Sequence, residues 1–317
     1  MMILFTAKMS PKYQERLREQ FPSAQFVFCR TREETDKHIG DAEVLVTYGG
    51  DVDELLVTHA DRLKWIMVLS AGVDQLPFPI IIKRKIMVTN ARGIHKGPMA
   101  EYAISMLLQV YRQEKSIINN ESEKRWDQSI VLKEISGRTM VVVGTGAIGQ
   151  EVARLAKAFR MKTIGISKSG KQVDYFDDVH ALEKLNTVLP EADFVISVLP
   201  STNETKRLFQ SFEFNQMSKH AVFLNMGRGD VLDEADLLEA VQQNVIGHAV
   251  LDVFADEPLS EDHPFWREKN ITVTPHISGV STEYVTRALD IFTENLTRYL
   301  ANEEDNFVNK IDVIKGY

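Results

Sequence analysis

The chain has 317 residues, of which 44% are hydrophobic, and it carries a formal net charge of -8 at pH 7. This length suits two globular domains, the negative charge argues against nucleic acid or an anionic membrane surface as a partner, and no apolar run is long enough to span a membrane. The single cysteine, Cys29, excludes an intrachain disulfide and favours a cytoplasmic protein.

The N-terminal part of the chain alternates short apolar runs with amphipathic ones, a pattern typical of a parallel α/β sheet. It begins with an apolar run, Met2–Thr6, that is too short for a signal peptide and that we predict to be the first strand. The further strands predicted here are Gln25–Cys29, Val44–Thr47, Trp65–Leu69 and Met87–Thr89. Helices are predicted at Pro11–Gln20, at Val52–Ala60 and from about Pro98 to Lys115.

A glycine-rich turn lies beyond the polar segment Ser116–Ser136 and is the most informative motif of the chain. The β-branched run Val141–Val143 leads directly into Gly144-Thr145-Gly146-Ala147-Ile148-Gly149, and an amphipathic run follows. This arrangement is typical of dinucleotide binding: the first glycine allows the turn, the second admits a pyrophosphate, and the third lets the helix pack on the strand. We predict cofactor contacts at Gly144, Thr145, Gly146, Ala147 and Ile148, and the alternative is a glycine-rich turn without a ligand.

The rest of the chain completes a second doubly wound parallel sheet. Six strands are predicted, at Met140–Val143, Thr163–Ile166, Phe194–Val198, Val222–Asn225, Ala249–Val253 and Thr272–Thr274. The last run, Ser281–Asn302, has helical spacing, and we expect this helix to return and pack on the first domain. The predicted fold class is therefore α/β, with a Rossmann dinucleotide-binding domain at 98–276 inserted into a discontinuous, flavodoxin-like substrate domain at 1–97 plus 277–317.

The segment after the second strand of the dinucleotide domain bears on the choice of cofactor. NAD-binding domains place an Asp or Glu there for the ribose 2′-hydroxyl, whereas this chain has Ser167-Lys168-Ser169. A lysine and two hydroxyls attract a 2′-phosphate, which a carboxylate would repel. The sequence therefore favours NADP, with NAD still possible, and the alternative is that Lys168 is an ordinary solvated lysine.

Three polar residues follow predicted strands further along the chain. Arg228 lies in Asn225-Met226-Gly227-Arg228-Gly229, Glu257 lies in Leu251-Asp252-Val253-Phe254-Ala255-Asp256-Glu257-Pro258, and His276 lies in Thr274-Pro275-His276. Ligands of open α/β sheets bind outside the carboxyl ends of the strands. An arginine fork can hold a carboxylate, and a histidine backed by a carboxylate can donate a proton near neutral pH. The trio therefore predicts reduction of a keto acid.

In their order and spacing these segments resemble the D-isomer-specific 2-hydroxyacid dehydrogenase family, with glyoxylate/hydroxypyruvate reductase-like members as the nearest group. The resemblance covers almost the whole chain, from Ser70-Ala71-Gly72-Val73-Asp74 through the glycine turn to the Thr-Pro-His segment. It implies that Arg228 binds the substrate carboxylate and keto oxygen, that His276 is the acid/base and that Glu257 pairs with it. It also implies substrate contacts at Ala71, Gly72 and Val73, a place near the nicotinamide for Asn90 and Gly93, and cofactor contacts at Ser167, Lys168, Ser169, Met226 and Asp252.

The resemblance further implies a homodimer through the Rossmann domain and the 116–136 arm. Trp126, within this arm, is then expected to anchor an interface, with a folded-back contact inside one chain as the alternative. The expected ligand is a small anionic 2-keto or 2-hydroxy acid, which must be held by a local positive site because the chain is acidic overall.

Two other functions stay open at this point. A formate-dehydrogenase-like oxidation is disfavoured because those relatives carry Gln where this chain has Glu257. A nucleotide-sensing scaffold, like the transcriptional corepressors of the family, is disfavoured because the chain has no obvious interaction tail. The remaining histidines form no metal-ligand spacing, so no metal site is expected.

Overall fold

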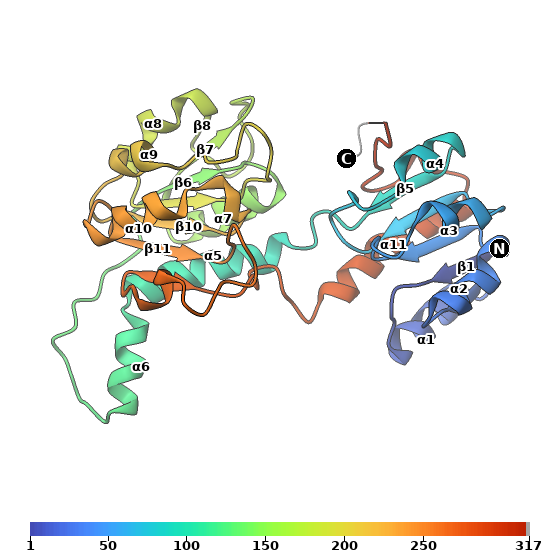
Figure 1. The fold of residues 1–317 in the computed structure, drawn as a ribbon, viewed down its shortest axis with the longest axis horizontal. Helices are drawn as coiled ribbons and strands as arrows, with labels where there is room; N and C mark the ends of the chain where they lie inside the picture. The colour runs from blue at the N-terminus through green and yellow to red at the C-terminus, as the bar shows by residue number, and fades with distance from the viewer. Residues whose placement is uncertain (315–317) are drawn as a thin grey trace. The chain divides into compact units, whose positions relative to one another are not determined.

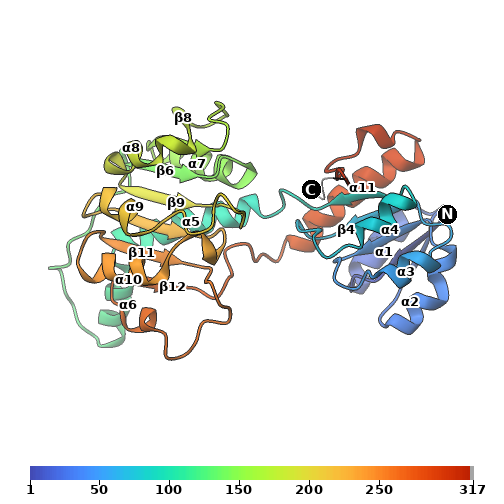
Figure 2. The same ribbon diagram turned by 45° about the horizontal axis from the view of Figure 1, so that its top comes forward.

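The computed structural model describes residues 1–314, which form two compact units (Figures 1 and 2). Unit 1 consists of Met1–Ile94 and the described part of Thr282–Tyr317, and unit 2 consists of His95–Ser281. Both are α/β units with parallel sheets, so the predicted fold class is confirmed. The roles predicted for 1–97 plus 277–317 and for 98–276 stay predictions, and residues 315–317 lie outside the described part of the chain.

Unit 1 contains a five-stranded parallel sheet with the flavodoxin-like order β2-β1-β3-β4-β5. Its strands are β1 (Met2–Phe5), β2 (Gln25–Phe28), β3 (Val44–Thr47), β4 (Trp65–Val68) and β5 (Met87–Asn90). Its helices are α1 (Pro11–Gln20), α2 (Arg32–His38), α3 (Glu54–His59), α4 (Phe78–Lys83) and the C-terminal α11 (Tyr284–Leu300).

The C-terminal helix α11 completes the core of unit 1. Phe292 of α11 stacks on Trp65 with ring centroids 5.6 Å apart and meets Phe5 edge-on at 5.5 Å. Because Trp65 and Phe5 belong to β4 and β1, the last helix covers a sheet that is built by the first residues of the chain.

Unit 2 contains a seven-stranded parallel sheet with the order β12-β11-β10-β9-β6-β7-β8. Its strands are β6 (Thr139–Val143), β7 (Lys162–Ser167), β8 (Asp178–Ala181), β9 (Phe194–Ser197), β10 (Val222–Asn225), β11 (His248–Leu251) and β12 (Ile271–Val273). The prediction of six strands is wrong because it omits β8, an edge strand of half-buried and exposed residues that lacks an apolar run.

The helices of unit 2 are α5 (Lys96–Tyr111), α6 (Glu114–Ser122), α7 (Ala147–Ala158), α8 (Leu185–Val188), α9 (Ser211–Gln216) and α10 (Glu234–Gln242). The single helix predicted from Pro98 to Lys115 is therefore two helices. Gln113 lies between them in the left-handed region, with φ of 54°, which ends the first helix. In Figure 1, α6 and the chain after it project from the body of unit 2. No helix of residues 1–314 has both the length and the apolar character to cross a membrane.

Candidate active site

The glycine turn between β6 and α7 has the geometry of a dinucleotide cradle. Gly144 has φ of +112°, and a Cβ atom there would lie 2.9 Å from the carbonyl oxygen of Val198. A Cβ at Gly149 would lie 2.0 Å from the carbonyl oxygen of Gly144, so only glycine lets α7 pack this closely. A Cβ at Gly146 would meet nothing within 4 Å, which leaves this side of the turn open. Gly144, Gly146 and Gly149 therefore fit turn formation, approach of a pyrophosphate and helix packing, respectively.

A carboxylate lies beside the predicted 2′-phosphate residues, but it comes from another loop. Nζ of Lys168 donates to Oε1 of Glu204 at 3.0 Å. The hydrogen bond from Lys168 lowers the pKa of Glu204. The hydroxyl of Ser167 accepts a bond from the Gly170 N–H at 3.2 Å, and its own proton can still be donated. No sequence motif marks Glu204, because the loop that carries it has no regular pattern at this position.

His276 and Glu257 form a hydrogen-bonded pair at the carboxyl end of the sheet of unit 2. Nδ1 of His276 lies 2.7 Å from Oε2 of Glu257, and Oε1 of Glu257 accepts the Phe254 N–H at 3.0 Å. Burial raises the pKa of Glu257, but the hydrogen bonds from His276 and Phe254 outweigh it, so the pKa is lowered. An ionised Glu257 accepts a hydrogen bond from the Nδ1 proton of the half-exposed imidazole.

A buried carboxylate holds the segment that carries His276. Asp252 is fully buried, and its Oδ1 accepts bonds from the Thr274 hydroxyl at 2.5 Å and the Ile277 N–H at 2.9 Å. Its Oδ2 accepts the Ser278 N–H at 2.8 Å. His276 itself has a left-handed φ of 54°, a conformation that a non-glycine residue keeps only when its surroundings impose it. Asp252 therefore positions the His276 turn, whereas its predicted contact with a cofactor stays a prediction.

Arg228 lies on a second turn, which packs directly against the loop of Glu257. The Asn225 side chain donates to the Arg228 carbonyl at 2.9 Å and accepts the Gly227 N–H at 3.2 Å, which shapes the turn. A Cβ at Gly229 would lie 1.9 Å from the carbonyl carbon of Phe254, so this glycine allows the two loops to touch. Arg228 is an exposed residue, and its guanidinium donates to the Gly227 carbonyl at 2.7 Å and contributes to lowering the pKa of Glu257. The structure thus brings Arg228, Glu257 and His276 to one end of the sheet, while Met226 lies buried beneath the Arg228 turn.

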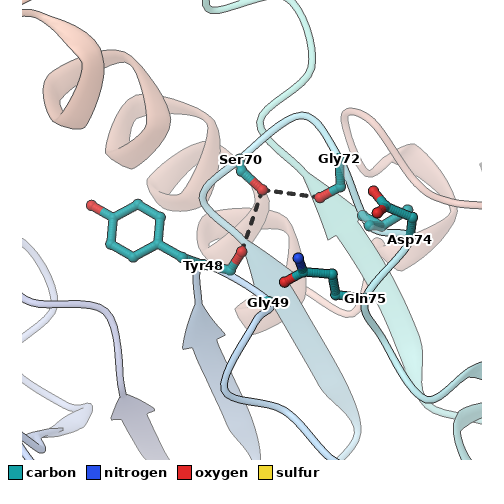
Figure 3. Close-up of a pocket in the computed structure, with 7 residues that line it drawn as sticks. Tyr48, Gly49, Ser70, Gly72, Asp74 and Gln75 are labelled. Carbon is teal, nitrogen blue, oxygen red and sulfur yellow. Dashed lines mark hydrogen bonds between the residues drawn. The ribbon is translucent and has the colours of Figure 1, made fainter. Parts of the chain in front are cut away.

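The other residues predicted to contact the substrate belong to unit 1. Ala71, Gly72 and Val73 follow β4, and the Asn90 side chain donates to the Ala71 carbonyl at 2.6 Å. Figure 3 shows the Ser70 hydroxyl between the carbonyls of Gly72 and Tyr48, to which it lies at 2.9 and 3.4 Å.

The same loop lines a small, mostly polar pocket of about 220 Å³. Its lining residues are Tyr48, Gly49, Ser70, Gly72, Val73, Asp74 and Gln75. Burial raises the pKa of Tyr48, so its phenol is a neutral hydroxyl near pH 7. Among residues 1–314, no three His, Cys, Asp or Glu side chains are placed to hold a metal ion.

Residues 104–278 match the family model described as "D-isomer specific 2-hydroxyacid dehydrogenase, NAD binding domain". A glyoxylate reductase of Thermococcus litoralis is 32% identical over 282 residues, which cover 86% of this chain and 85% of that protein.

Two solved structures are similar over nearly their whole length. A D-isomer specific 2-hydroxyacid dehydrogenase family protein of Aeromonas salmonicida is 34% identical with a TM-score of 0.85, covering 98% of this chain and 99% of the other. An NADPH-dependent glyoxylate/hydroxypyruvate reductase of Sinorhizobium meliloti, in complex with NADP and sulfate, is 25% identical with a TM-score of 0.78. That alignment covers 100% of this chain and 99% of the Sinorhizobium protein.

Proposed function

The chain belongs to the D-isomer-specific 2-hydroxyacid dehydrogenase family, and we propose that it reduces a small 2-keto acid such as glyoxylate or hydroxypyruvate to the D-2-hydroxy acid. The observation that carries the proposal is the 2.7 Å contact of His276 with Glu257, on the loop that packs against the turn of Arg228. Keto-acid reduction requires two kinds of protein group, a proton donor and a cation that binds a carboxylate. Both are present at the carboxyl end of the sheet of unit 2.

In this proposal His276 supplies the proton. The protonated imidazole transfers its Nε2 proton to the keto oxygen, and Glu257 holds the Nδ1 proton and stabilises the positive charge before the transfer. A bound nicotinamide cofactor supplies the hydride that the keto carbon receives. The keto group thereby gains one hydride and one proton and becomes a hydroxyl group.

Arg228 has two roles in this proposal. Its planar fork can bind the substrate carboxylate through paired hydrogen bonds, and its charge stabilises the negative charge that develops on the keto oxygen. The N–H groups of Ala71, Gly72 and Val73 are proposed as further contacts of the substrate carboxylate. The small polar pocket beside Gly72 suits a hydrogen or a hydroxymethyl group rather than a bulky apolar side chain.

We propose NADP as the cofactor, with NAD possible. The fit of Gly144, Gly146 and Gly149 to a pyrophosphate supports a dinucleotide. The NADP complex of the Sinorhizobium relative and the cation at Lys168 support the 2′-phosphate. The residues that would hold the cofactor are Gly144, Thr145, Gly146, Ala147, Ile148, Ser167, Lys168, Ser169, Met226 and Asp252.

A substrate panel measured with both cofactors tests the proposal. Purified protein is assayed with glyoxylate, hydroxypyruvate, pyruvate and phenylpyruvate, each with NADPH and with NADH. We expect glyoxylate and hydroxypyruvate, each with NADPH, to give the highest kcat/KM. Absence of turnover with every pair, while either cofactor binds, would favour the nucleotide-sensing scaffold, and NAD-dependent oxidation of formate would favour the formate-dehydrogenase-like function.

We also propose a cytoplasmic homodimer that forms through the Rossmann domain and the arm at 116–136. This arm carries exposed apolar side chains, among them Ile118, Val131 and Trp126, and the last of these is 89% exposed. Trp126 lines a groove of about 490 Å³, and a second copy of the chain would remove this apolar surface from water.

Sedimentation equilibrium of Trp126→Ser tests the dimer. Trp266→Ser is the matched control, because Trp266 is also exposed and lies elsewhere in unit 2. We expect the dissociation constant of the dimer to rise only for Trp126→Ser, and a monomeric wild type would refute the assembly.

A further inference from the structure

The order of strands in unit 2 places two oppositely charged side chains, Lys168 and Glu204, on the loops at the two sides of the glycine turn. β6 pairs in parallel with β7 on one side and with β9 on the other, so the carboxyl ends of all three strands lie side by side at the same end of the sheet. The glycine turn follows β6, Lys168 follows β7, and Glu204 lies on the loop after β9. The Lys168–Glu204 ion pair therefore connects the two loops that flank the dinucleotide cradle.

Local hydrogen bonds hold the loop that presents Glu204. The Thr205 hydroxyl donates to the Pro200 carbonyl at 2.6 Å and accepts the Thr202 N–H at 2.8 Å, which closes the segment into a tight turn. The two charged groups themselves are open to water, with side-chain exposures of 87% for Lys168 and 60% for Glu204. The backbone of the loop is thus fixed, while the ion pair is solvent-screened and can exchange partners.

We propose that Glu204 is a specificity-determining residue that competes with the 2′-phosphate of NADPH for Lys168. This inference rests on the proposed use of NADPH. Binding of the phosphate replaces one carboxylate partner of Lys168 with a group of greater charge and three acceptor oxygens. Glu204 therefore reduces the affinity for NADPH below the value that Lys168 alone would give. NADH carries no group that competes for Lys168, so its affinity is independent of Glu204.

The size of the effect follows from the exposure of the pair. Solvent-exposed ion pairs are weak, so breaking this one corresponds to a change of about two- to fivefold in an equilibrium constant. Glu204→Gln keeps the shape of the side chain and removes its charge. It should tighten NADPH binding by this factor at low ionic strength and leave NADH binding unchanged.

A closely matched control lies at the amino ends of the same strands. Lys162 and Glu191 form an exposed ion pair at 3.2 Å, next to the amino ends of β7 and β9. Glu191→Gln removes a carboxylate of the same kind from the same unit, but it lies at the end of the strands remote from the glycine turn. It should change neither cofactor affinity.

Dissociation constants are measured by fluorescence titration with NADPH and NADH, without substrate, for wild type, Glu204→Gln, Glu191→Gln, Lys168→Gln and the double variant Glu204→Gln/Lys168→Gln. We expect Glu204→Gln to tighten NADPH binding in the wild-type background and to have no effect when Lys168 is absent, because the competition requires the lysine. Circular dichroism confirms that each variant is folded.

Four results would overturn the inference. Three of them are an unchanged NADPH affinity in Glu204→Gln, an equal gain in NADH affinity, and the same gain in the Lys168→Gln background. The fourth is a loss of NADH affinity, because Glu204 would then be a ribose ligand. Failure of the wild type to bind either dinucleotide would refute the proposed function itself, which is a distinguishable outcome.

Discussion

Nδ1 of His276 lies 2.7 Å from Oε2 of Glu257, which is 19 residues away in the chain. The imidazole is therefore oriented by a carboxylate from a different loop. We therefore expect the loss of His276 to lower the rate of the chemical step more than the loss of any other side chain.

His276→Ala should lower kcat by roughly 10²- to 10⁴-fold, because it removes the proposed general acid. Cofactor affinity, measured by fluorescence titration, should survive because the glycine turn is unchanged. His220→Ala is a suitable control, since His220 also pairs with a carboxylate, Asp193 at 3.1 Å, and is similarly exposed. Near-normal turnover of His276→Ala would refute the assignment.

Glu257→Gln should move the alkaline limit of keto-acid reduction to lower pH. The amide can still hold the ring, but it no longer stabilises the protonated imidazole by charge. The pKa of Glu257 is lowered in the folded protein, so its carboxylate stays ionised throughout the neutral range and becomes protonated only in acid. The pH dependence of kcat/KM is the measurement, and identical profiles for variant and wild type would mean that the two residues do not interact during catalysis.

Arg228→Lys should raise KM for the keto acid and lower kcat. Lysine keeps the positive charge but cannot hold a carboxylate and a keto oxygen together through a planar fork. Steady-state kinetics with glyoxylate provide the test. Wild-type behaviour would place the carboxylate-binding cation elsewhere.

The double variant Ser167→Asp/Lys168→Ala should invert the cofactor preference from NADPH to NADH. The aspartate supplies an acceptor for the ribose 2′-hydroxyl, and loss of the lysine removes the partner of the 2′-phosphate. In the wild type, the exposed lysine should favour NADPH about ten- to thirtyfold in kcat/KM, and less at high salt. A wild type that uses NADH equally well at any salt concentration would contradict the role of Lys168.

His248 should make the stability of unit 2 depend on pH. Burial, together with the nearby charge of Lys115, lowers the pKa of His248 to about 4 from its ordinary value of 6.5. Nε2 of His248 lies 2.9 Å from the Thr272 hydroxyl, which also accepts a bond from Lys115 at 2.9 Å. The neutral imidazole fits this site, whereas a protonated imidazole would be repelled by the positive charge of Lys115.

Because the pKa of His248 is lower in the folded chain, the unfolded chain takes up the proton first as the pH falls. The free energy of unfolding should be highest above pH 6.5 and should fall by up to roughly 3 kcal/mol as the pH approaches 4. Denaturant unfolding of His248→Gln should lack this component. An equal pH dependence in variant and wild type would show that His248 does not contribute to it.

Sequence patterns predicted the fold class and the turns that carry the chemistry. The run Val141–Val143 followed by the glycine motif specifies strand, turn and helix through local periodicity, and the structure has β6 and α7 there. Arg228 and His276 follow β10 and β12, and the apolar residues of these two strands also identify the strands in the sequence. Parallel strands expose their carboxyl ends at one edge, so these side chains were expected to gather.

Local patterns failed where an element has no apolar periodicity or where one residue interrupts it. The edge strand β8 is stabilised by pairing with β7, and its own residues show no strand pattern. The break between α5 and α6 depends on the left-handed conformation of Gln113, which a glutamine does not signal in sequence.

The sequence by itself determined the α/β class, the glycine cradle and the three groups proposed for keto-acid reduction, because each follows from spacing along the chain. Only the tertiary structure decided which groups meet across loops. Glu204 pairs with Lys168 across 36 residues, and Asp252 holds the N–H groups of Ile277 and Ser278 from the neighbouring strand end. Such contacts depend on strand order and on the packing of one loop against another, and neither leaves a periodic trace in the sequence.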